Sequence, residues 1–195
     1  MTSTATPFET PFDRLKTALA ERERDVMHIE GFRPAAVLVP ILQKEDGFEL
    51  LFTVRSAELS SHAGQISFPG GRCDPGETIT EAARRETLEE VGLTVEESDL
   101  LGFLDDHPSP ARYIVTPVVA LLPYPEQLKL NPAEVDAVFT APLRDLFALT
   151  PYTEERQLMQ YRRTLHFYPY GKQLIWGLTG NVLKNLLELL AEMGS

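Results

Sequence analysis

A long polar loop that runs directly into a helix with clearly marked ends constrains the fold of this chain more than any other feature. Residues 56–76 are rich in Gly, Ser, Pro and Asp, and a loop of that length inside a compact domain usually has a function. Residues 79–91 then predict a helix. Thr78 is its expected N-cap, Glu81 completes a capping box, and Gly92 stands where a C-terminal cap belongs. The fold must therefore present a shaped loop in front of a well-defined helix.

Three glutamates share one face of this predicted helix. Because successive residues are about 100° apart, Glu86, Glu89 and Glu90 span an arc of roughly 100°. The adjoining face, which looks like the buried side, carries Ala83, Thr87, Leu88 and Val91. The carboxylates therefore lie near a packed edge, where their mutual repulsion is less screened than in water.

Two kinds of group can offset this repulsion. Arg85 can pair with Glu81 and Glu89 at i±4. A hard divalent cation such as Mg²⁺ or Mn²⁺ prefers oxygen ligands, and it offsets the repulsion between carboxylates more strongly than one arginine does. A charged helix face is most often only a solvated surface, so the three glutamates by themselves leave both interpretations open.

The rest of the chain predicts strands and helices in mixed order. Residues 12–27 predict a helix, and residues 35–43 and 48–54 predict a β-hairpin through the turn signal Asp46-Gly47. Pro40, inside the first of these strands, suggests an edge position or a bulge. Later segments predict strands at 100–104 and 113–122, mixed elements at 128–151, a strand pair within 157–168, a strand at 173–176 and an amphipathic helix at 181–193.

This order of elements predicts an α+β fold in a layered helix–sheet–helix arrangement. The length suits a single domain over residues 1–195, with an N-terminal helix at about 12–27 and a core at about 34–190.

Charge and composition exclude several classes of function. The chain carries 18 Lys and Arg against 29 Asp and Glu, and a net charge of −11 argues against a nucleic-acid binder. A small anionic substrate is still allowed, because a bound divalent cation inverts the local sign of a site. The single cysteine, Cys73, excludes an internal disulfide. With no membrane-spanning apolar run and no signal peptide, a cytoplasmic protein is expected.

Two blocks at fixed spacing resemble a known family motif. The first is Gly71-Arg72-Cys73-Asp74-Pro75-Gly76-Glu77, and the second, after seven residues, is Arg85-Glu86-Thr87-Leu88-Glu89-Glu90-Val91-Gly92-Leu93. Together they resemble the Nudix box, with Thr87 as the one departure, at a position that usually holds a bulky aliphatic residue. The resemblance implies an α/β/α sandwich with a mixed sheet and a loop–helix–loop motif. It also implies Mg²⁺- or Mn²⁺-dependent attack of water on the diphosphate of a nucleotide derivative.

The resemblance further implies roles for individual residues. Glu86 and Glu90 should bind metal, joined by a backbone carbonyl at Gly70 or Gly71. Glu89 is expected to hold a second ion through water or to act as the base. Arg85 should orient the glutamates rather than touch substrate, and Glu77 should support the cluster. Outside the box, Glu134 is a weaker candidate for the base, and its alternative is a surface acid before a strand.

A second signature, before the box, resembles that of coenzyme A-hydrolysing Nudix proteins. It consists of residues 51–56, then Leu59, His62 and Gly64, and finally residues 68–71. Asp74 and residues 175–179 fit the same pattern. The implied reaction converts coenzyme A into adenosine 3′,5′-bisphosphate and 4′-phosphopantetheine.

The expected substrate contacts are Arg55, Ser56, His62 and Phe68. The guanidinium of Arg55 can grip a phosphate bidentately. His62 can donate to a phosphate or hold the loop, and Phe68 is expected to fix the loop rather than stack on adenine. Cys73 is not expected to act as a nucleophile, and Trp176 is assigned to the core.

Two other functions stay open. One is a Nudix hydrolase for another substrate, such as ADP-ribose, a nucleotide sugar, a dinucleoside polyphosphate or a damaged nucleoside triphosphate. The other is a non-catalytic nucleotide sensor, which the loss of a box glutamate would favour, and none is lost. In either case the partner is a small nucleotide-like molecule and not a nucleic acid or a membrane. A homodimer is also left open.

Overall fold

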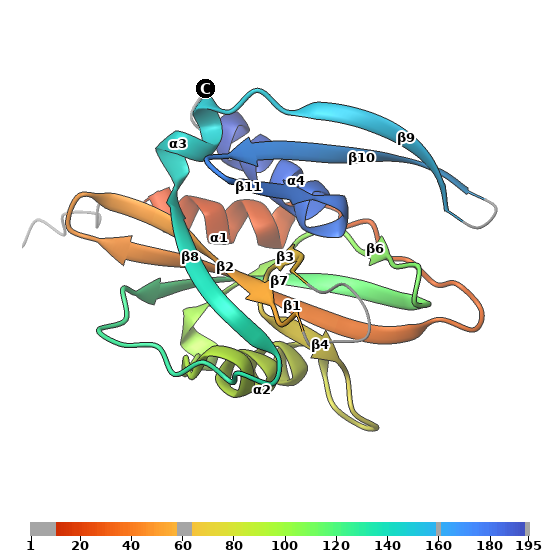
Figure 1. The fold of residues 1–195 in the computed structure, drawn as a ribbon, viewed down its shortest axis with the longest axis horizontal. Coiled ribbons are helices and arrows are strands. Elements are labelled where there is room, and N and C mark those ends of the chain that lie inside the picture. Colours follow the sequence, from red (N-terminus) through yellow and green to blue (C-terminus); the bar gives the residue numbers. More distant parts are fainter. Residues whose placement is uncertain (1–10, 58–63, 159–160, 194–195) are drawn as a thin grey trace, which may run out of the picture.

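The computed structural model describes residues 11–57, 64–158 and 161–193, so Leu59 and His62 lie outside the described residues. An eight-stranded mixed sheet lies between helices, and a second, three-stranded sheet lies beside it (Figure 1). In the part of the chain that is described, no helix is long and apolar enough to cross a membrane.

The large sheet is built around two long parallel strands. Its members are β1 (Arg33–Lys44), β2 (Gly47–Arg55), β3 (Ile66–Ser67), β4 (Gly70–Arg72), β5 (Leu100–Phe103), β6 (His107–Pro108), β7 (Tyr113–Pro123) and β8 (Val135–Pro142). The main order is β3-β2-β1-β7-β5, while β4 pairs with β1, β6 with β7 and β8 with β2. β1 and β7 run parallel over their whole length. The predicted hairpin joins β1 and β2, with Lys44 opposite Gly47 across a two-residue turn.

β1 changes neighbours halfway along, and this change makes room for the loop before the glutamate helix. Residues 41–44 of β1 pair with β2, whereas residues 35–37 pair with β4. Beyond the hairpin, β2 pairs instead with β3 through Thr53 and Val54. The loop that was predicted to be shaped therefore enters the sheet as two short strands, β3 and β4.

Pro40 lies in a central strand, so the predicted edge position is wrong. On the β2 and β4 side of β1, the strand pairs stop at Val37 and resume at Ile41. Pro40 lies in that gap, where no ladder hydrogen bond requires the N–H that proline lacks. The change of neighbours therefore accommodates the proline without an edge.

Helices cover both faces of the large sheet. α2 (Ile79–Val91) packs on one face, and α1 (Pro11–Glu21) and α4 (Gly177–Met193) pack on the other; the short α3 (Leu143–Ala148) and a 3₁₀ turn (Glu97–Asp99) complete the helices of the described residues. One apolar core joins Leu15 and Leu183 to Ile41 of the sheet, and the other joins Ala83 and Val91 to Leu38. The predicted helix–sheet–helix arrangement is confirmed (Figure 1).

The N-terminal helix is shorter than predicted, because side chains after β5 hold the next segment extended. Asp105 accepts from the amide of Asp25 at 2.9 Å, and Asp106 accepts from the amide of Met27 at 3.0 Å. These carboxylates take backbone donors that a longer helix would have satisfied internally. The helix accordingly ends at Glu21 rather than near Met27.

The second sheet was not foreseen as a separate unit. It consists of β9 (Tyr152–Leu158), β10 (Tyr161–Tyr170) and β11 (Gln173–Trp176), in the order β11-β10-β9. The strand pair predicted within residues 157–168 is part of this sheet, which begins earlier, at Tyr152. α4 follows directly and begins at Gly177, before the predicted residue 181. In Figure 1 this sheet lies beside α4, and its strand β11 contacts β3 of the large sheet.

Candidate active site

Both ends of α2 are held as predicted, and this sets the direction of its side chains. The Thr78 hydroxyl accepts from the Glu81 amide, and the Glu81 carboxylate accepts from the Thr78 amide at 2.8 Å. At the other end Gly92 adopts the left-handed conformation, with φ of 71°, and its amide donates to the Leu88 carbonyl. One detail of the predicted face is wrong: Leu88 is 52% exposed, because the packed side of α2 is formed by Ala82, Ala83, Thr87, Glu90 and Val91.

Three carboxylates from two elements meet beside α2. Oxygen atoms of Glu86, Glu90 and Glu134 all lie within 4.8 Å of one another. Glu134 directly precedes β8, and the pairing of β8 with β2 brings it to the helix. Its carboxylate accepts from the side chain of Asn131 at 3.2 Å. The structure thus brings Glu134 into the cluster, although its sequence context fits a surface acid.

Glu89 does not join this cluster. Its side chain is 51% exposed and pairs with Arg85 at 3.1 Å. The shared helical face was therefore correctly predicted for Glu86 and Glu90, whereas Glu89 lies at its solvent side. The predicted roles of Glu89, to hold a second ion through water or to act as the base, stay predictions.

The cluster is costly without a cation. Glu90 is only 2% exposed, and burial raises its pKa to about 7 against the opposing effects of the Gly70 amide and Arg55. Burial likewise raises the pKa of Glu86, although Arg85 donates to that carboxylate. Glu134 adds repulsion to both. Three converging carboxylates, of which one is buried, are a donor set that fits a hard divalent cation such as Mg²⁺ or Mn²⁺.

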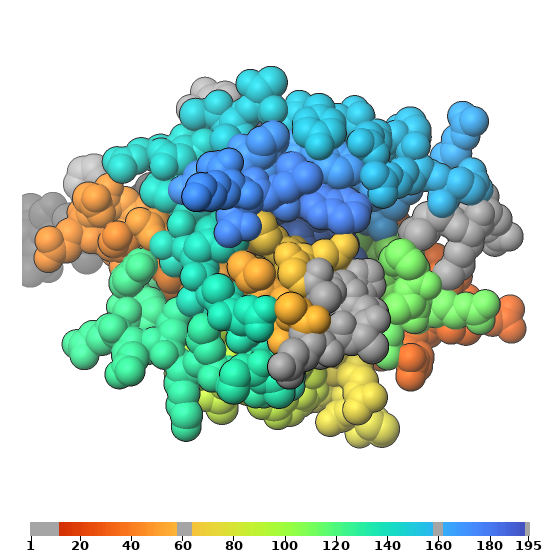
Figure 2. Space-filling view, in the orientation of Figure 1, coloured from red at the N-terminus to blue at the C-terminus, as the bar shows by residue number. Residues whose placement is uncertain are grey.

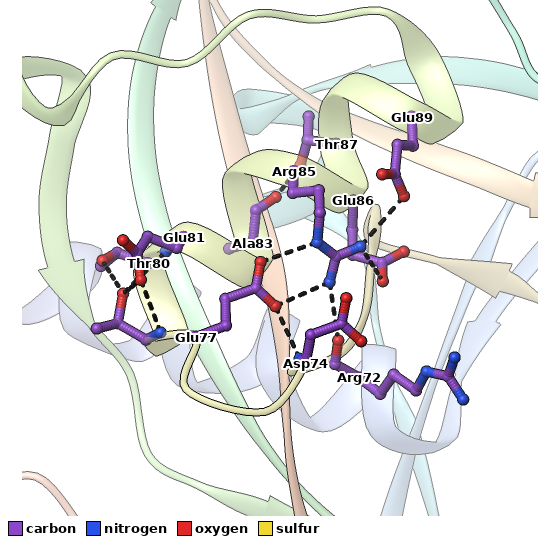
Figure 3. A network of polar contacts seen from close by, with 11 residues as sticks. Arg72, Asp74, Glu77, Thr80, Glu81, Ala83, Arg85, Glu86, Thr87 and Glu89 are labelled. Carbon is purple, nitrogen blue, oxygen red and sulfur yellow. Dashed lines mark hydrogen bonds and ion pairs between the residues drawn. The ribbon is translucent and has the colours of Figure 1, made fainter.

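Arg85 links the glutamates of the helix to the preceding loop (Figure 3). Its Nε and Nη2 donate to both oxygens of Glu77, at 2.8 and 2.9 Å, and its Nη1 donates to Glu86 at 2.8 Å and to Glu89 at 3.1 Å. A further bond goes to the carbonyl of Arg72. The guanidinium therefore orients carboxylates of the helix and of the loop.

The predicted pairing of Arg85 with Glu81 is wrong. Glu81 is engaged with the amide and hydroxyl of Thr78 at the start of the helix. Glu77 takes the partner position instead, and its bond from Arg85 lowers its pKa.

Two glycines allow the loop to approach the cluster. A Cβ on Gly71 would lie 2.5 Å from the carboxyl carbon of Glu86, and a Cβ on Gly70 would lie 2.3 Å from the carbonyl oxygen of Ala36. The Gly70 amide donates to Glu90 at 3.2 Å. A side chain at position 70 would collide with backbone, and a side chain at position 71 would displace the Glu86 carboxylate from the cluster. The predicted metal contact through the Gly70 carbonyl stays a prediction.

A cavity of about 620 Å³ borders the cluster and is rich in arginine. Its walls come from the loop before α2, the segment between β6 and β7, the second sheet and the start of α4. Its polar and aromatic lining includes Arg55, Arg72, Arg156, Arg163, Phe68, Tyr113 and Trp176. In Figure 2 the C-terminal residues, in blue, form the upper part of this face, and residues of the loop before α2, in yellow, lie beneath them.

Two of the predicted substrate contacts, Arg55 and Phe68, line this cavity. The Nε of Arg55 is buried and has no hydrogen-bond partner among the described residues. An unpaired buried donor costs free energy, so this nitrogen suits an incoming anion. Phe68 is buried and stacks on Phe52 at 4.8 Å, which fits the prediction that it fixes the loop.

Other predictions for the substrate side need correction. Ser56 is 1% exposed and does not line the cavity, so the prediction that it contacts substrate does not fit. Its amide instead donates to the carbonyl of Glu134 at 2.8 Å and so positions a member of the cluster. Trp176 is not a core residue but lines the cavity. His62 lies outside the described residues, and its role stays a prediction.

Comparisons with known proteins are consistent with this geometry. The family model described as "NUDIX domain" matches residues 31–161. The Nudix hydrolase NudL of Photorhabdus laumondii is 43% identical over 160 residues, which is 80% of this chain and 84% of that protein. The human mitochondrial coenzyme A diphosphatase NUDT8 is 40% identical over 163 residues, or 80% of this chain and 69% of that protein.

A solved structure shows the same fold. The Ap4A hydrolase of Caenorhabditis elegans, solved as a binary complex, superposes with a TM-score of 0.52. The match covers 82% of this chain and 98% of that one, at 21% sequence identity.

Proposed function

Since this chain belongs to the NUDIX family, we propose that it hydrolyses the diphosphate bond of coenzyme A or a derivative, using Mg²⁺ or Mn²⁺. The products are adenosine 3′,5′-bisphosphate and 4′-phosphopantetheine. The observation that carries the proposal is the meeting of Glu86, Glu90 and Glu134 at the edge of an arginine-lined cavity.

The residues in and around the cluster suit three different roles: metal binding, positioning of a carboxylate and phosphate binding. Glu86, Glu90 and Glu134 would hold the divalent ion, which neutralises phosphate charge and makes water a better nucleophile when bound. Arg85 and Glu77 keep Glu86 in place through bonds of 2.8 Å. Arg55, whose Nε has no hydrogen-bond partner among the described residues, binds a phosphate oxygen of the substrate.

A carboxylate must accept the proton of the attacking water. Glu134 and Glu89 are the two candidates, and the geometry favours Glu134. Glu134 lies in the cluster, whereas Glu89 is half exposed and already paired with Arg85. A general base has to lie within hydrogen-bond reach of the water that it deprotonates.

Four observations support coenzyme A as the substrate. The signature of residues 51–71 resembles that of coenzyme A-hydrolysing proteins, and the human relative carries that activity in its name. The cavity volume lies within the usual range for ligand sites, about 300–1,000 Å³. Its four arginines suit a substrate with several phosphates. We further propose that the partner is this small molecule and no nucleic acid; a homodimer and a cytoplasmic location stay predictions.

The test is product analysis of the purified protein with coenzyme A, ADP-ribose or a nucleoside triphosphate, each with Mg²⁺ or Mn²⁺ and with a chelator control. We expect chelator-sensitive release of adenosine 3′,5′-bisphosphate, chiefly from coenzyme A. Glu86→Gln should nearly abolish turnover, while Glu97→Gln, a change at an exposed glutamate outside the cluster, should not. Preferred cleavage of another substrate would refute the choice of coenzyme A, and no cleavage at all would favour a nucleotide sensor.

A further inference from the structure

Two arginines lie directly opposite each other on the face of the second sheet that borders the cavity. Arg156 of β9 and Arg163 of β10 are register partners, and both line the cavity. Like charges directly opposite on adjacent strands destabilise a sheet. Such a pair therefore needs a compensating partner, either in the protein or in a ligand.

Arg156 has its compensation within the protein. Its Nη2 donates to the carboxylate of Glu154 at 2.7 Å, and its guanidinium lies 5.5 Å from the ring centre of Trp176. This arginine is thus paired with an acid and packed on an aromatic ring.

Arg163 is different, because its partners are neutral. Its Nη1 donates to the carbonyl of Pro108, and its Nη2 donates to the Nδ1 of His107 at 2.8 Å. Within residues 11–57, 64–158 and 161–193, no carboxylate lies within ion-pair distance of it. Burial lowers its pKa, with no acid to oppose the effect.

The surroundings of His107 do not supply the missing negative charge. Burial and the adjacent Arg163 lower the pKa of His107 to about 4, so the ring is neutral at pH 7. The two nearby acids are engaged elsewhere. Asp105 pairs with Arg22, and Asp106 accepts from Thr116 and from the amide of Met27. Arg163 therefore brings a positive charge to the cavity wall that the described residues do not neutralise.

Arg163 lies on a different wall from the reacting cluster. The glutamate side of the cavity is marked by Gly70, Gly71 and Arg55, which adjoin Glu86 and Glu90. Arg163 belongs to β10, most of which lies beyond residue 161, where the match to the NUDIX family model ends. Because this wall lies apart from the glutamates, it is suited to selecting among substrates that share the same diphosphate.

We propose that Arg163 forms a subsite for a phosphomonoester of the substrate that is separate from the diphosphate being cleaved. This inference rests on the proposed function, in which that group is the 3′-phosphate of coenzyme A. The Pro108 carbonyl and His107 each hold one terminal nitrogen of the guanidinium, and its remaining N–H groups, which bond to no other described residue, are available to the phosphate. Arg163 is then a residue that determines specificity, and it does not take part in the bond cleavage.

The first test compares coenzyme A with dephospho-coenzyme A, which lacks only the 3′-phosphate. In Arg163→Gln we expect kcat/KM for coenzyme A to fall about 10- to 100-fold, as for loss of a hydrogen bond between charged groups. The value for dephospho-coenzyme A should stay within about twofold of the wild type. Arg163→Lys should retain part of the preference, because it keeps the charge but not the fork of donors.

Arg162→Gln is the matched control. Arg162 is the preceding residue on β10, its side chain is exposed and it does not line the cavity. Arg162→Gln removes the same charge from the opposite side of the strand. It should leave kcat/KM unchanged for both coenzyme A and dephospho-coenzyme A. Equal losses on both substrates in Arg163→Gln would indicate a structural role, and no loss on either would also overturn the subsite.

A binding measurement separates this proposal from the proposed function. Trp176 is the one tryptophan of the chain and lines the cavity, so its fluorescence can report binding of adenosine 3′,5′-bisphosphate and of adenosine 5′-monophosphate. The bisphosphate should bind more tightly to the wild type, and Arg163→Gln should abolish the difference. If this holds while coenzyme A is not cleaved, the subsite stands and the proposed reaction fails. If the two nucleotides bind the wild type equally, the subsite is refuted whatever the enzyme cleaves.

Discussion

Individual carboxylates in this protein differ sharply although they stand close together in the sequence. Glu90 is buried and accepts from the Gly70 amide, Glu86 is held by Arg85, and Glu89 is half exposed. Their environments set their chemistry, because burial favours the uncharged form and a nearby guanidinium favours the charged one. The same residue type thereby occurs as a buried acid, as an acid held by an arginine and as a half-exposed surface partner.

Glu134→Gln tests the contribution of the one cluster member outside the box. We expect kcat to fall by about 100-fold or more, because the substitution removes both a carboxylate ligand and the favoured base. Steady-state kinetics at saturating Mg²⁺ would measure this. Glu89→Gln provides the comparison and should lower kcat less. A larger loss in Glu89→Gln would transfer the role of base to Glu89.

His107 should make stability depend on pH. Burial and Arg163 lower its pKa from 6.5 to about 4. The imidazole therefore binds a proton more weakly in the folded protein than in the unfolded chain. The stability that neutral His107 contributes is complete above about pH 6.5 and is lost as the pH falls toward 4. The shift corresponds to about 3 kcal/mol.

Urea denaturation between pH 7 and pH 4 would measure this effect. His107→Gln should flatten the pH dependence in that range, whereas His28→Gln, at an exposed position, should not. An unchanged slope in His107→Gln would show that other groups account for the acid lability.

At the scale of elements, α2 acts as a rigid carrier of the site. Its capping box and its glycine cap satisfy backbone groups at both ends, so the helix begins and ends where the sequence requires. The Arg85 network ties the helix to the loop that contains Glu77. Because loop and helix are joined in this way, we expect a substitution at the start of the helix to alter the positions of the glutamate side chains.

Thr78→Ala removes the N-cap of α2. We expect a loss of about 1 kcal/mol in the free energy of unfolding, since the Glu81 amide loses its side-chain acceptor. Chemical denaturation would measure the loss. Thr80→Ala removes a neighbouring hydroxyl that does not cap the helix and should cost less. Equal costs would show that the cap contributes nothing specific.

At the scale of the whole molecule, the site lies where three parts of the fold meet. The large sheet provides Glu134 through β8 and the loop glycines through β4, α2 provides the other glutamates, and the second sheet closes the cavity. A cation held between α2 and the segment before β8 would cross-link parts that are separate in the sequence.

Mg²⁺ should therefore stabilise the folded protein. A ligand that binds only the folded state, at about 100 times its Kd, contributes about 2.7 kcal/mol. For a chain of this length we expect Tm to rise by about 5–10 °C, measured by thermal melting with and without chelator. Glu86→Gln should reduce the rise, and an undiminished rise in that variant would place the ion elsewhere.

The sequence alone determined the parts of the site whose signals are local. Helix α2 with both caps, the shared face of Glu86 and Glu90, the β1–β2 hairpin and the layered α+β class all depend on spacings of a few residues, and the structure agrees with them. Hydrogen bonds and side-chain periodicity within one element can be predicted from the residues of that element alone.

Only the tertiary structure decided which distant residues meet. The pairing of β8 with β2 brought Glu134 to the cluster, the gap between β2 and β4 placed Pro40 in a central strand, and the second sheet put Arg163 and Trp176 on the cavity wall. Likewise, the N-terminal helix ended early because Asp105 and Asp106, far along the chain, took its backbone donors. These outcomes depend on long-range packing and strand order, which leave no periodic signal in the sequence near the residues concerned.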